Sequence, residues 1–267
     1  MALNKIMACA SLGNSLKDKL ALALFGLIAP RSEWSRERWW HVFPSAIPQM
    51  WLRPKKLNGL RLLISPTNWS QTVIFEEVFL RGNYDLSKVR FTPEVIVDCG
   101  AHIGMFSLLA KSAFPSARHI AFEPNAENAQ LMRRQITENE VDIELIESAI
   151  SIEATELMFT ASNSHSGRLL RNEYSCGAYK VGVVNFPETI KQMQPASLIL
   201  KMDIEGEERN VFPVLMPSLP RKCALFFETH FGEEGWREIE TLLSSNGFQV
   251  EQMNARGQCF DGFAYRE

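Results

Sequence analysis

Residues 95–106 carry the feature that most constrains the fold of this chain. An apolar, β-branched run, 95–97, ends in Asp98, then Gly100 and Gly104 bracket a short turn, and an apolar segment follows. This order is typical of a buried parallel strand, a glycine loop and a helix. Glycine tolerates a positive φ and has no Cβ to keep a ligand away, and helix-start amides point at a bound ligand. The stretch therefore predicts a doubly wound, nucleotide-type α/β fold.

From residue 95 onward, apolar strand-like runs alternate with segments of helical period. The expected strands are 95–99, 119–124, 143–150, 197–203, 223–230, 248–253 and 262–266, and the expected helices are 104–114, 125–139, 205–215 and 233–246. Residues 157–160 are expected to extend the sheet at one side. Alternation of this kind predicts a Rossmann-like fold, with a mostly parallel seven-stranded sheet and helices on both faces. Residues 161–182 have the composition of a loop, and long loops in compact domains often bind ligands.

The first 60 residues differ in character from the rest. They contain a predicted helix, 16–28, followed by Trp34, Trp39, Trp40 and Trp51 among arginines and prolines. We divide the chain into a mainly helical N-terminal extension, 1–60, and a ligand-binding domain, 61–267. The aromatic residues either dock the extension on the main domain or form a lid or oligomer contact, and a homodimer through this extension is one expectation. A short strand, 61–65, and a helix, 72–81, are expected next.

Composition excludes several classes of function. The net charge of −3 gives no basic footprint for nucleic acid. The apolar run 20–29 is too short to span a bilayer, so we expect no transmembrane segment; helix packing is favoured over a peripheral membrane anchor. Five scattered cysteines lack metal or disulfide spacing and indicate reduced thiols in a cytoplasmic protein: Cys9, Cys99, Cys176, Cys223 and Cys259.

Polar residues gather where the predicted strands end. In an open α/β sheet, ligands bind outside the carboxyl ends of the strands. The residues at these ends are Asp98, Gly100, Gly104, Glu123, Ser148, Asp203, Glu205, Glu228 and His230. Glu123 follows Gly100 by 23 positions, and a carboxylate there can accept hydrogen bonds from ribose hydroxyls. The alternative for Glu123 is a solvated acid that caps the next helix.

The glycine loop argues against a dinucleotide. The G-x-G-x-x-G fingerprint needs glycines where this chain has His102 and Met105, and its second glycine lets the backbone approach a pyrophosphate. Asp98 also puts a negative charge where a pyrophosphate would lie. That charge suits a ligand with an ammonium group and no phosphate, such as S-adenosylmethionine. The sequence contains no P-loop motif.

Three segments together resemble the FkbM family of class I, S-adenosylmethionine-dependent methyltransferases. They are 97–104 (VDCGAHIG), 122–124 (FEP) and 201–208 (KMDIEGEE). The K-x-D-x-E-G-x-E pattern of the third segment is the family-specific part, and the resemblance covers about residues 74–253. His102 departs from the family, which usually has asparagine there.

The resemblance implies a cofactor site and a methyl-transfer activity. It implies that Asp98, Gly100, Ala101 and Gly104 hold the methionine portion, Glu123 the ribose, Ser148 and Ala149 the adenine side, and that Asp203 lies between cofactor and acceptor, with Glu205 beside it. His102 belongs to the same loop and can hydrogen-bond through its imidazole. Family members chiefly O-methylate hydroxyls of sugars, polyketides and other natural products.

The transfer is an in-line attack of an acceptor oxygen on the methyl carbon, helped by a base. His230 is the expected base because an ordinary imidazole titrates near neutral pH, with Asp203 and Glu228 beside it as further catalytic candidates. Alternatively, the acids hold a divalent cation or only cap helices; no metal is assigned. His165 in the 161–182 loop is a weaker base candidate.

We therefore expect a cytoplasmic methyltransferase that acts on a hydroxyl of a small molecule, with no nucleic-acid partner. The alternatives are methyl transfer to nitrogen or carboxylate, and a non-catalytic module that binds a partner on the same fold.

Overall fold

The computed structural model describes residues 2–28, 49–153, 155–161, 167–170 and 178–267. Its central sheet has seven strands in the order β12-β13-β11-β10-β3-β4-β5. They are β3 (Val95–Cys99), β4 (Arg118–Phe122), β5 (Glu144–Ile146), β10 (Ser197–Met202), β11 (Lys222–Thr229), β12 (Gln249–Arg256) and β13 (Cys259–Arg266). Six of the seven run in the same direction, and β13 runs antiparallel between β11 and β12. The predicted mostly parallel α/β sheet is confirmed.

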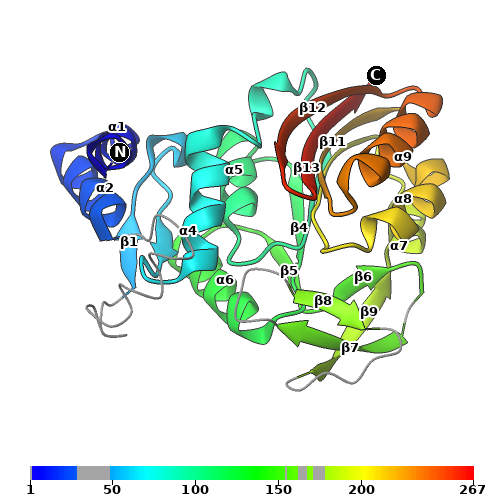
Figure 1. Ribbon diagram of the computed structural model, residues 1–267, viewed down its shortest axis with the longest axis horizontal. Helices are drawn as coiled ribbons and strands as arrows, with labels where there is room; N and C mark the ends of the chain where they lie inside the picture. Colours follow the sequence, from blue (N-terminus) through cyan, green and yellow to red (C-terminus); the bar gives the residue numbers. More distant parts are fainter. Residues whose placement is uncertain (1, 29–48, 154, 162–166, 171–177) are drawn as a thin grey trace.

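Helices cover both faces of this sheet (Figure 1). The helices on one face are α5 (Met105–Ala113) and α6 (Ala126–Glu138); those on the other are α7 (Phe186–Met193), α8 (Glu208–Leu215) and α9 (Gly232–Ser245). Successive residues of a strand point to opposite faces. Ile96 thus packs with Phe106 of α5, while Val97 packs with Phe212 of α8. Burial of each large apolar side chain contributes about 1.5 to 3 kcal/mol, so both layers hold the sheet in place.

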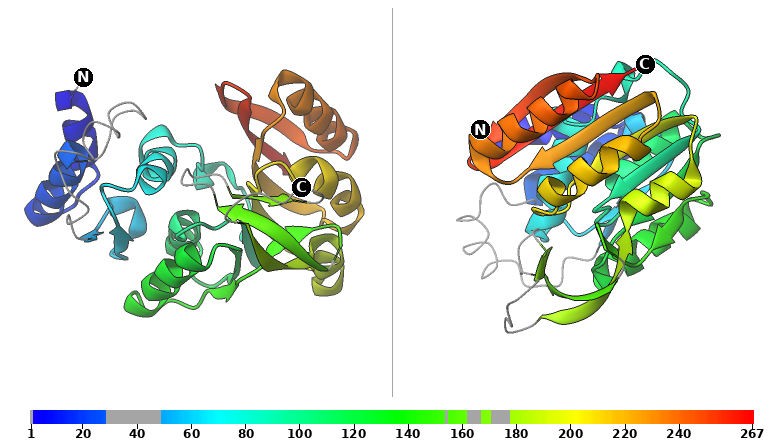
Figure 2. Two further views of the ribbon diagram at one scale, coloured as in Figure 1. Left: turned by 60° about the horizontal axis from the view of Figure 1, so that its bottom comes forward. Right: turned by 90° about the vertical axis from the view of Figure 1, so that its right-hand side faces the viewer.

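A second sheet corrects two expectations. It has the strand order β6-β9-β7-β8, from β6 (Ala149–Ser151), β7 (Thr155–Ala161), β8 (Gly167–Leu170) and β9 (Tyr179–Asn185). The single strand expected at 143–150 is wrong, because a tight turn at Ser148 separates β5 from β6. The expected loop at 161–182 contains β8 and the start of β9, and residues 157–160 join this sheet instead of the central one. Figure 2 shows it beside the central sheet.

The N-terminal extension begins with two helices, α1 (Ala2–Ser11) and α2 (Leu16–Ile28), of which the second was predicted. Phe25 of α2 packs on Phe75, with ring centroids 4.6 Å apart. Lys5 of α1 forms a salt bridge of 2.7 Å with Glu76. These contacts dock the helices on the segment that follows. Trp34, Trp39 and Trp40, expected in a cap or lid, lie outside the described residues, as do His165 and Cys176.

A short hairpin and a helix that changes from α to π geometry connect the extension to the central sheet. The hairpin pairs β1 (Met50–Leu52) with β2 (Leu62–Ile64) across η1 (Lys55–Leu57), so the proposed division at residue 60 falls inside it. The next helix is α4 (Trp69–Phe75), capped by the Asn68 side chain, and it continues as a π-helix, η2 (Glu76–Arg81). The Leu63 N–H donates to Gln135 Oε1 at 2.9 Å and so ties the hairpin to α6.

The surface of the extension carries an exposed stripe of leucines on α2: Leu16, Leu20, Leu24 and Leu27. The homodimer through this extension stays a prediction. No helix within the described ranges is long and apolar enough to cross a bilayer. The predicted strand positions of Cys99 and Cys223 are confirmed, in β3 and β11, and both thiols are buried and unbridged.

Candidate active site

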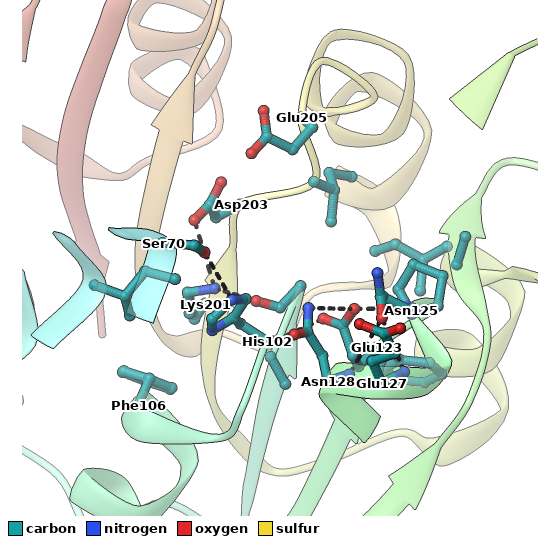
Figure 3. A pocket seen from close by; sticks show the side chains of 18 of the residues that line it. Ser70, His102, Phe106, Glu123, Asn125, Glu127, Asn128, Lys201, Asp203 and Glu205 are labelled. Carbon is teal, nitrogen blue, oxygen red and sulfur yellow. Dashed lines mark hydrogen bonds and ion pairs between the residues drawn. The ribbon is translucent and has the colours of Figure 1, made fainter. Parts of the chain in front are cut away.

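A cavity of about 620 Å³ opens at the carboxyl ends of β3, β4 and β10 (Figure 3). Its described lining includes eight of the predicted site residues: Gly100, Ala101, His102, Glu123, Ser148, Ala149, Asp203 and Glu205. The second sheet contributes Phe159 and Tyr179, and α4 and η2 contribute Ser70 and Glu77. The cavity thus brings together residues that are far apart in the sequence, at the edge where parallel α/β sheets bind ligands.

The glycine loop has the backbone that the sequence predicted. Gly100 has a φ of +79°, and a Cβ added to it would lie 1.9 Å from the carbonyl oxygen of Asp203. Gly104 has a φ of +84° and caps the start of α5. Both positions therefore require glycine: the first because two backbones approach closely, the second because the chain turns into a helix with a left-handed residue.

His102 also adopts the left-handed conformation, with a φ of +52°. Asparagine and histidine are among the few non-glycine residues that adopt it readily, which explains how histidine replaces the family's usual asparagine. His102 Nε2 lies 2.8 Å from Ser70 Oγ. Its backbone N–H donates to Glu123 Oε2 at 2.7 Å. The residue thus links the loop to α4 on one side and to the end of β4 on the other.

Glu123 is a nearly buried carboxyl group at the end of β4. It also accepts hydrogen bonds from the Asn125 backbone N–H at 2.9 Å and the Asn128 side chain at 3.4 Å. Burial raises the pKa of Glu123 to about 7, against the lowering effect of these hydrogen bonds and that of His102. Glu123 therefore titrates near neutral pH, at the position where the sequence predicted a ribose contact.

Lys201 contacts the glycine loop and two of the predicted acids, although the sequence predicted no role for it. Its Nζ donates to the Gly100 carbonyl at 2.7 Å and lies 3.4 Å from Asp98 Oδ1 and 3.7 Å from Asp203 Oδ2. Burial acts against the charge, but Asp98 and Asp203 outweigh it and hold the pKa of Lys201 above its ordinary value. A lysine inside an otherwise apolar strand was the available signal.

Four predicted residues do not line this cavity. Asp98, Gly104, Glu228 and His230 are not among the described residues that line it. Asp98 accepts a hydrogen bond of 2.6 Å from Ser107 and pairs with Lys201, so its charge is already compensated within the protein. Direct contact of Asp98 with the methionine portion stays a prediction.

His230 lies within a group of four carboxylates. Its Nε2 lies 3.4 Å from Glu205 Oε2, 3.8 Å from Glu228 Oε1 and 3.9 Å from Asp203 Oδ1, and its Nδ1 lies 3.4 Å from Glu208 Oε1. Burial acts to lower the pKa of His230, but Glu208, Asp203 and Glu205 raise it to about 10. Burial, then the charge of Asp203, raises the pKa of Glu205 and of Glu228. An imidazole in this setting carries a proton at neutral pH, which counts against His230 as the base.

A second group of polar contacts joins η2 and its following turn to the last two strands. Arg256 of β12 forms ion pairs with Glu77, and with Asp261 at 3.4 Å. Asn83 donates to Asp261 Oδ2 at 2.9 Å. These contacts hold the Glu77 wall of the cavity against the edge of the sheet. Glu77 belongs to a π-helix, a distortion frequent at functional sites, but nothing near it in the sequence indicates these partners.

Comparison with known proteins identifies the family. The model of the methyltransferase FkbM domain matches residues 98–250. Methyltransferase sdnD of Sordaria araneosa is 33% identical over 217 residues, covering 68% of this chain and 83% of that protein. The 31-O-demethyl-FK506 methyltransferase FkbM of Streptomyces tacrolimicus is 25% identical over 211 residues, covering 66% and 81%.

The fold is also found in a solved structure, TYW2 of M. jannaschii in complex with AdoMet. The TM-score is 0.50 at 12% identity, with 84% of this chain and 90% of that chain covered. The matched family region contains the glycine loop, Glu123 and Asp203. The chain belongs to the FkbM family of methyltransferases.

Proposed function

We propose that this protein uses S-adenosylmethionine to methylate a hydroxyl group of a small molecule. The observation that carries the proposal is that Glu123 and Asp203, from the ends of β4 and β10, line one cavity with the glycine loop between them (Figure 3). Oxygen as the acceptor atom is supported by the relative named 31-O-demethyl-FK506 methyltransferase, whose name specifies an O-methyl position.

The size of the cavity suits this cofactor, and so does the arrangement of the residues that line it. Its volume of about 620 Å³ lies within the usual range of small-molecule sites. The Phe159 and Tyr179 rings meet edge to face, 5.7 Å apart, beside Ser148 and Ala149. Such an aromatic wall favours a flat purine. Glu123 then serves the ribose hydroxyls, and Asp203 lies toward the methyl group.

S-adenosylmethionine supplies a methyl group on a sulfonium sulfur: the acceptor oxygen forms the new O–C bond as the S–C bond breaks. The protein's residues hold the acceptor in line with that bond, and alignment is the main source of rate enhancement in such a step. The wall opposite the second sheet comes from α4 and η2, with Ser70, Ile74, Glu77 and Val78 in the lining. We assign recognition of the acceptor to this wall.

We assign the proton of the acceptor hydroxyl to the Asp203 carboxylate. Asp203 lines the cavity, whereas His230 is not among the described lining residues and holds its own proton because its pKa is raised to about 10. His230 Nε2 lies 3.9 Å from Asp203 Oδ1, which places a cation beside the carboxylate that takes the proton. Glu228, 3.8 Å from the same nitrogen, shares this cation.

Titration calorimetry tests the cofactor. S-adenosylmethionine and its demethylated product are expected to bind, and NAD is not; binding of NAD alone would refute the proposal. Glu123→Ala is expected to weaken cofactor binding at least ~10-fold through the lost hydrogen bonds to ribose. Glu144→Ala, an exposed acid on the neighbouring β5, is the matched control and should bind normally. Equal affinity of both variants would remove the ribose role of Glu123.

The acceptor atom requires a product analysis. Incubation with pooled hydroxyl-bearing metabolites, followed by mass spectrometry, is expected to show a product heavier by one CH₂ whose methyl group fragments as an ether. A methyl amine or a methyl ester would establish the alternative acceptor, nitrogen or carboxylate. Normal cofactor binding with no methylated product from any pool would favour the non-catalytic alternative.

A further inference from the structure

The turn between β10 and α8 holds an unusual backbone. Glu205 has a φ of +57° and Gly206 a φ of +108°, so two consecutive residues are left-handed. A non-glycine residue in this conformation costs roughly 1 to 2 kcal/mol. The turn nevertheless sets the positions of Asp203 and Glu205 on the cavity wall. Something in the protein must therefore hold it.

Glu208, the first residue of α8, provides that support. Its Oε1 accepts the Ile204 N–H at 2.7 Å, and its Oε2 accepts the Gly206 N–H at 2.9 Å. The side chain is 1% exposed. Both oxygens are thus used by backbone amides of one turn, in charge-assisted hydrogen bonds. The turn acquires a fixed shape from a side chain that does not itself line the cavity.

The same carboxylate also faces His230. Glu208 Oε1 lies 3.4 Å from His230 Nδ1, which leaves Nε2 to face Asp203, Glu205 and Glu228. A third group that orients an imidazole toward a reacting residue is a recurrent arrangement in enzymes. Among the described residues, Cys259 of β13 completes the titratable surroundings of this histidine, near Glu228.

We propose that Glu208 is a positioning residue that controls methyl transfer through two others: it fixes the turn that carries Asp203, and it orients the His230 ring toward Asp203. This inference rests on the proposed function. It also explains why the K-x-D-x-E-G-x-E pattern ends in glutamate, since two amides and one imidazolium need two anionic oxygens. Glutamine has the same shape but one acceptor oxygen and no charge.

Glu208→Gln tests the proposal, with Glu207→Gln as the matched control. Glu207 precedes it, is also buried, and accepts hydrogen bonds from Ser151 and Asn210 away from His230. Glu208→Gln is expected to lower kcat roughly 10- to 100-fold, with KM for S-adenosylmethionine changed less than about threefold, as for a misplaced reacting group. Glu207→Gln should keep kcat within about twofold. Equal kcat values for Glu208→Gln and wild type would overturn the proposal.

Two further measurements need no activity. In Glu208→Gln, NMR titration is expected to show the His230 midpoint lower than in wild type, and hydrogen exchange to show faster exchange at the Ile204 and Gly206 amides. Both should stay unchanged in Glu207→Gln. An unchanged midpoint with unchanged exchange would overturn the positioning role, even if kcat fell. Failure of wild type to bind S-adenosylmethionine would instead refute the proposed function, while these two measurements would still report on Glu208.

Discussion

Lys201 and Asp98 are register partners on the adjacent parallel strands β10 and β3, and their charged atoms lie 3.4 Å apart with both side chains buried. The pair connects the sheet to the cavity, because Lys201 Nζ also donates to the Gly100 carbonyl. Removing one partner of a buried pair leaves an uncompensated charge, which is far more destabilising than loss of an exposed pair.

Lys201→Met is therefore expected to lower the free energy of unfolding by about 3 to 5 kcal/mol. Urea denaturation measures this loss. Lys191→Met, which breaks an exposed pair with Glu188 on α7, should cost less than about 1 kcal/mol. Adding Asp98→Asn to Lys201→Met should restore part of the stability, because the unpaired charge is then removed. If Lys201→Met and Lys191→Met lost similar amounts of stability, the role of the buried pair would be contradicted.

The Glu123 carboxyl predicts a pH dependence of stability. Its pKa rises from 4.5 to about 7 on folding, so the folded state binds the proton more tightly than the unfolded state. The contribution is fully present below the unfolded pKa and is lost as pH rises through about 7. Because a pKa difference of one unit corresponds to about 1.4 kcal/mol, the loss amounts to roughly 3 kcal/mol.

The unfolding free energy of wild type minus that of Glu123→Gln isolates this contribution from those of the other carboxyls. Between pH 4.5 and pH 8, wild type is expected to lose about 3 kcal/mol of stability relative to Glu123→Gln. Denaturant titration at several pH values measures it. A difference that does not vary with pH would mean that Glu123 keeps an ordinary pKa in the folded protein.

Gly100→Ala is expected to be severely destabilising. A Cβ there would lie 1.9 Å from the Asp203 oxygen, so the strands or the loop must move, at a cost of at least about 2 kcal/mol beyond the backbone strain. Gly59→Ala, at a φ of +99° with open space around it, should cost only the strain, about 1 to 2 kcal/mol. Thermal unfolding of both variants gives the comparison; equal costs would rule out the close approach.

His102→Asn is expected to leave the fold intact, because asparagine accepts the left-handed conformation that His102 adopts at a φ of +52°. His102→Val should cost about 1 to 3 kcal/mol more, since a β-branched residue is strained there. The melting temperatures of the two variants show whether His102→Asn is the more stable one, as expected. A valine variant as stable as the asparagine variant would show that the loop changes shape without cost.

The sequence predicted those parts of the fold in which a local conformation requires a particular residue type. The glycines of the loop, the apolar period of the strands and the Asn125 cap of α6 each depend on neighbours within a few positions. The second sheet was missed for a related reason: Val181 and Val183 alternate as in a strand, but the alternation is short and contains a glycine. Residues 143–150 read as one strand, but the turn at Ser148 divides them.

Long-range charge partners were beyond reach from the sequence. Nothing near Glu77 indicates Arg256 as its partner, and nothing near His230 indicates that Glu208 faces it. The base assignment for His230 assumed an ordinary imidazole pKa, but the folded chain surrounds the ring with carboxylates that raise this pKa to about 10. Residue identity predicted which side chains gather around the cavity, whereas their protonation states depend on tertiary packing.

The hydrogen bond between Asn83 and Asp261 joins residues 178 positions apart. During synthesis on a ribosome, the η2 segment, with its Glu77, emerges long before its partners on β12 and β13. The glycine loop and Glu123 can be in place while that wall has no support. The wall to which we assign acceptor recognition is therefore the part of the cavity that is completed last, when β12 and β13 have joined the sheet.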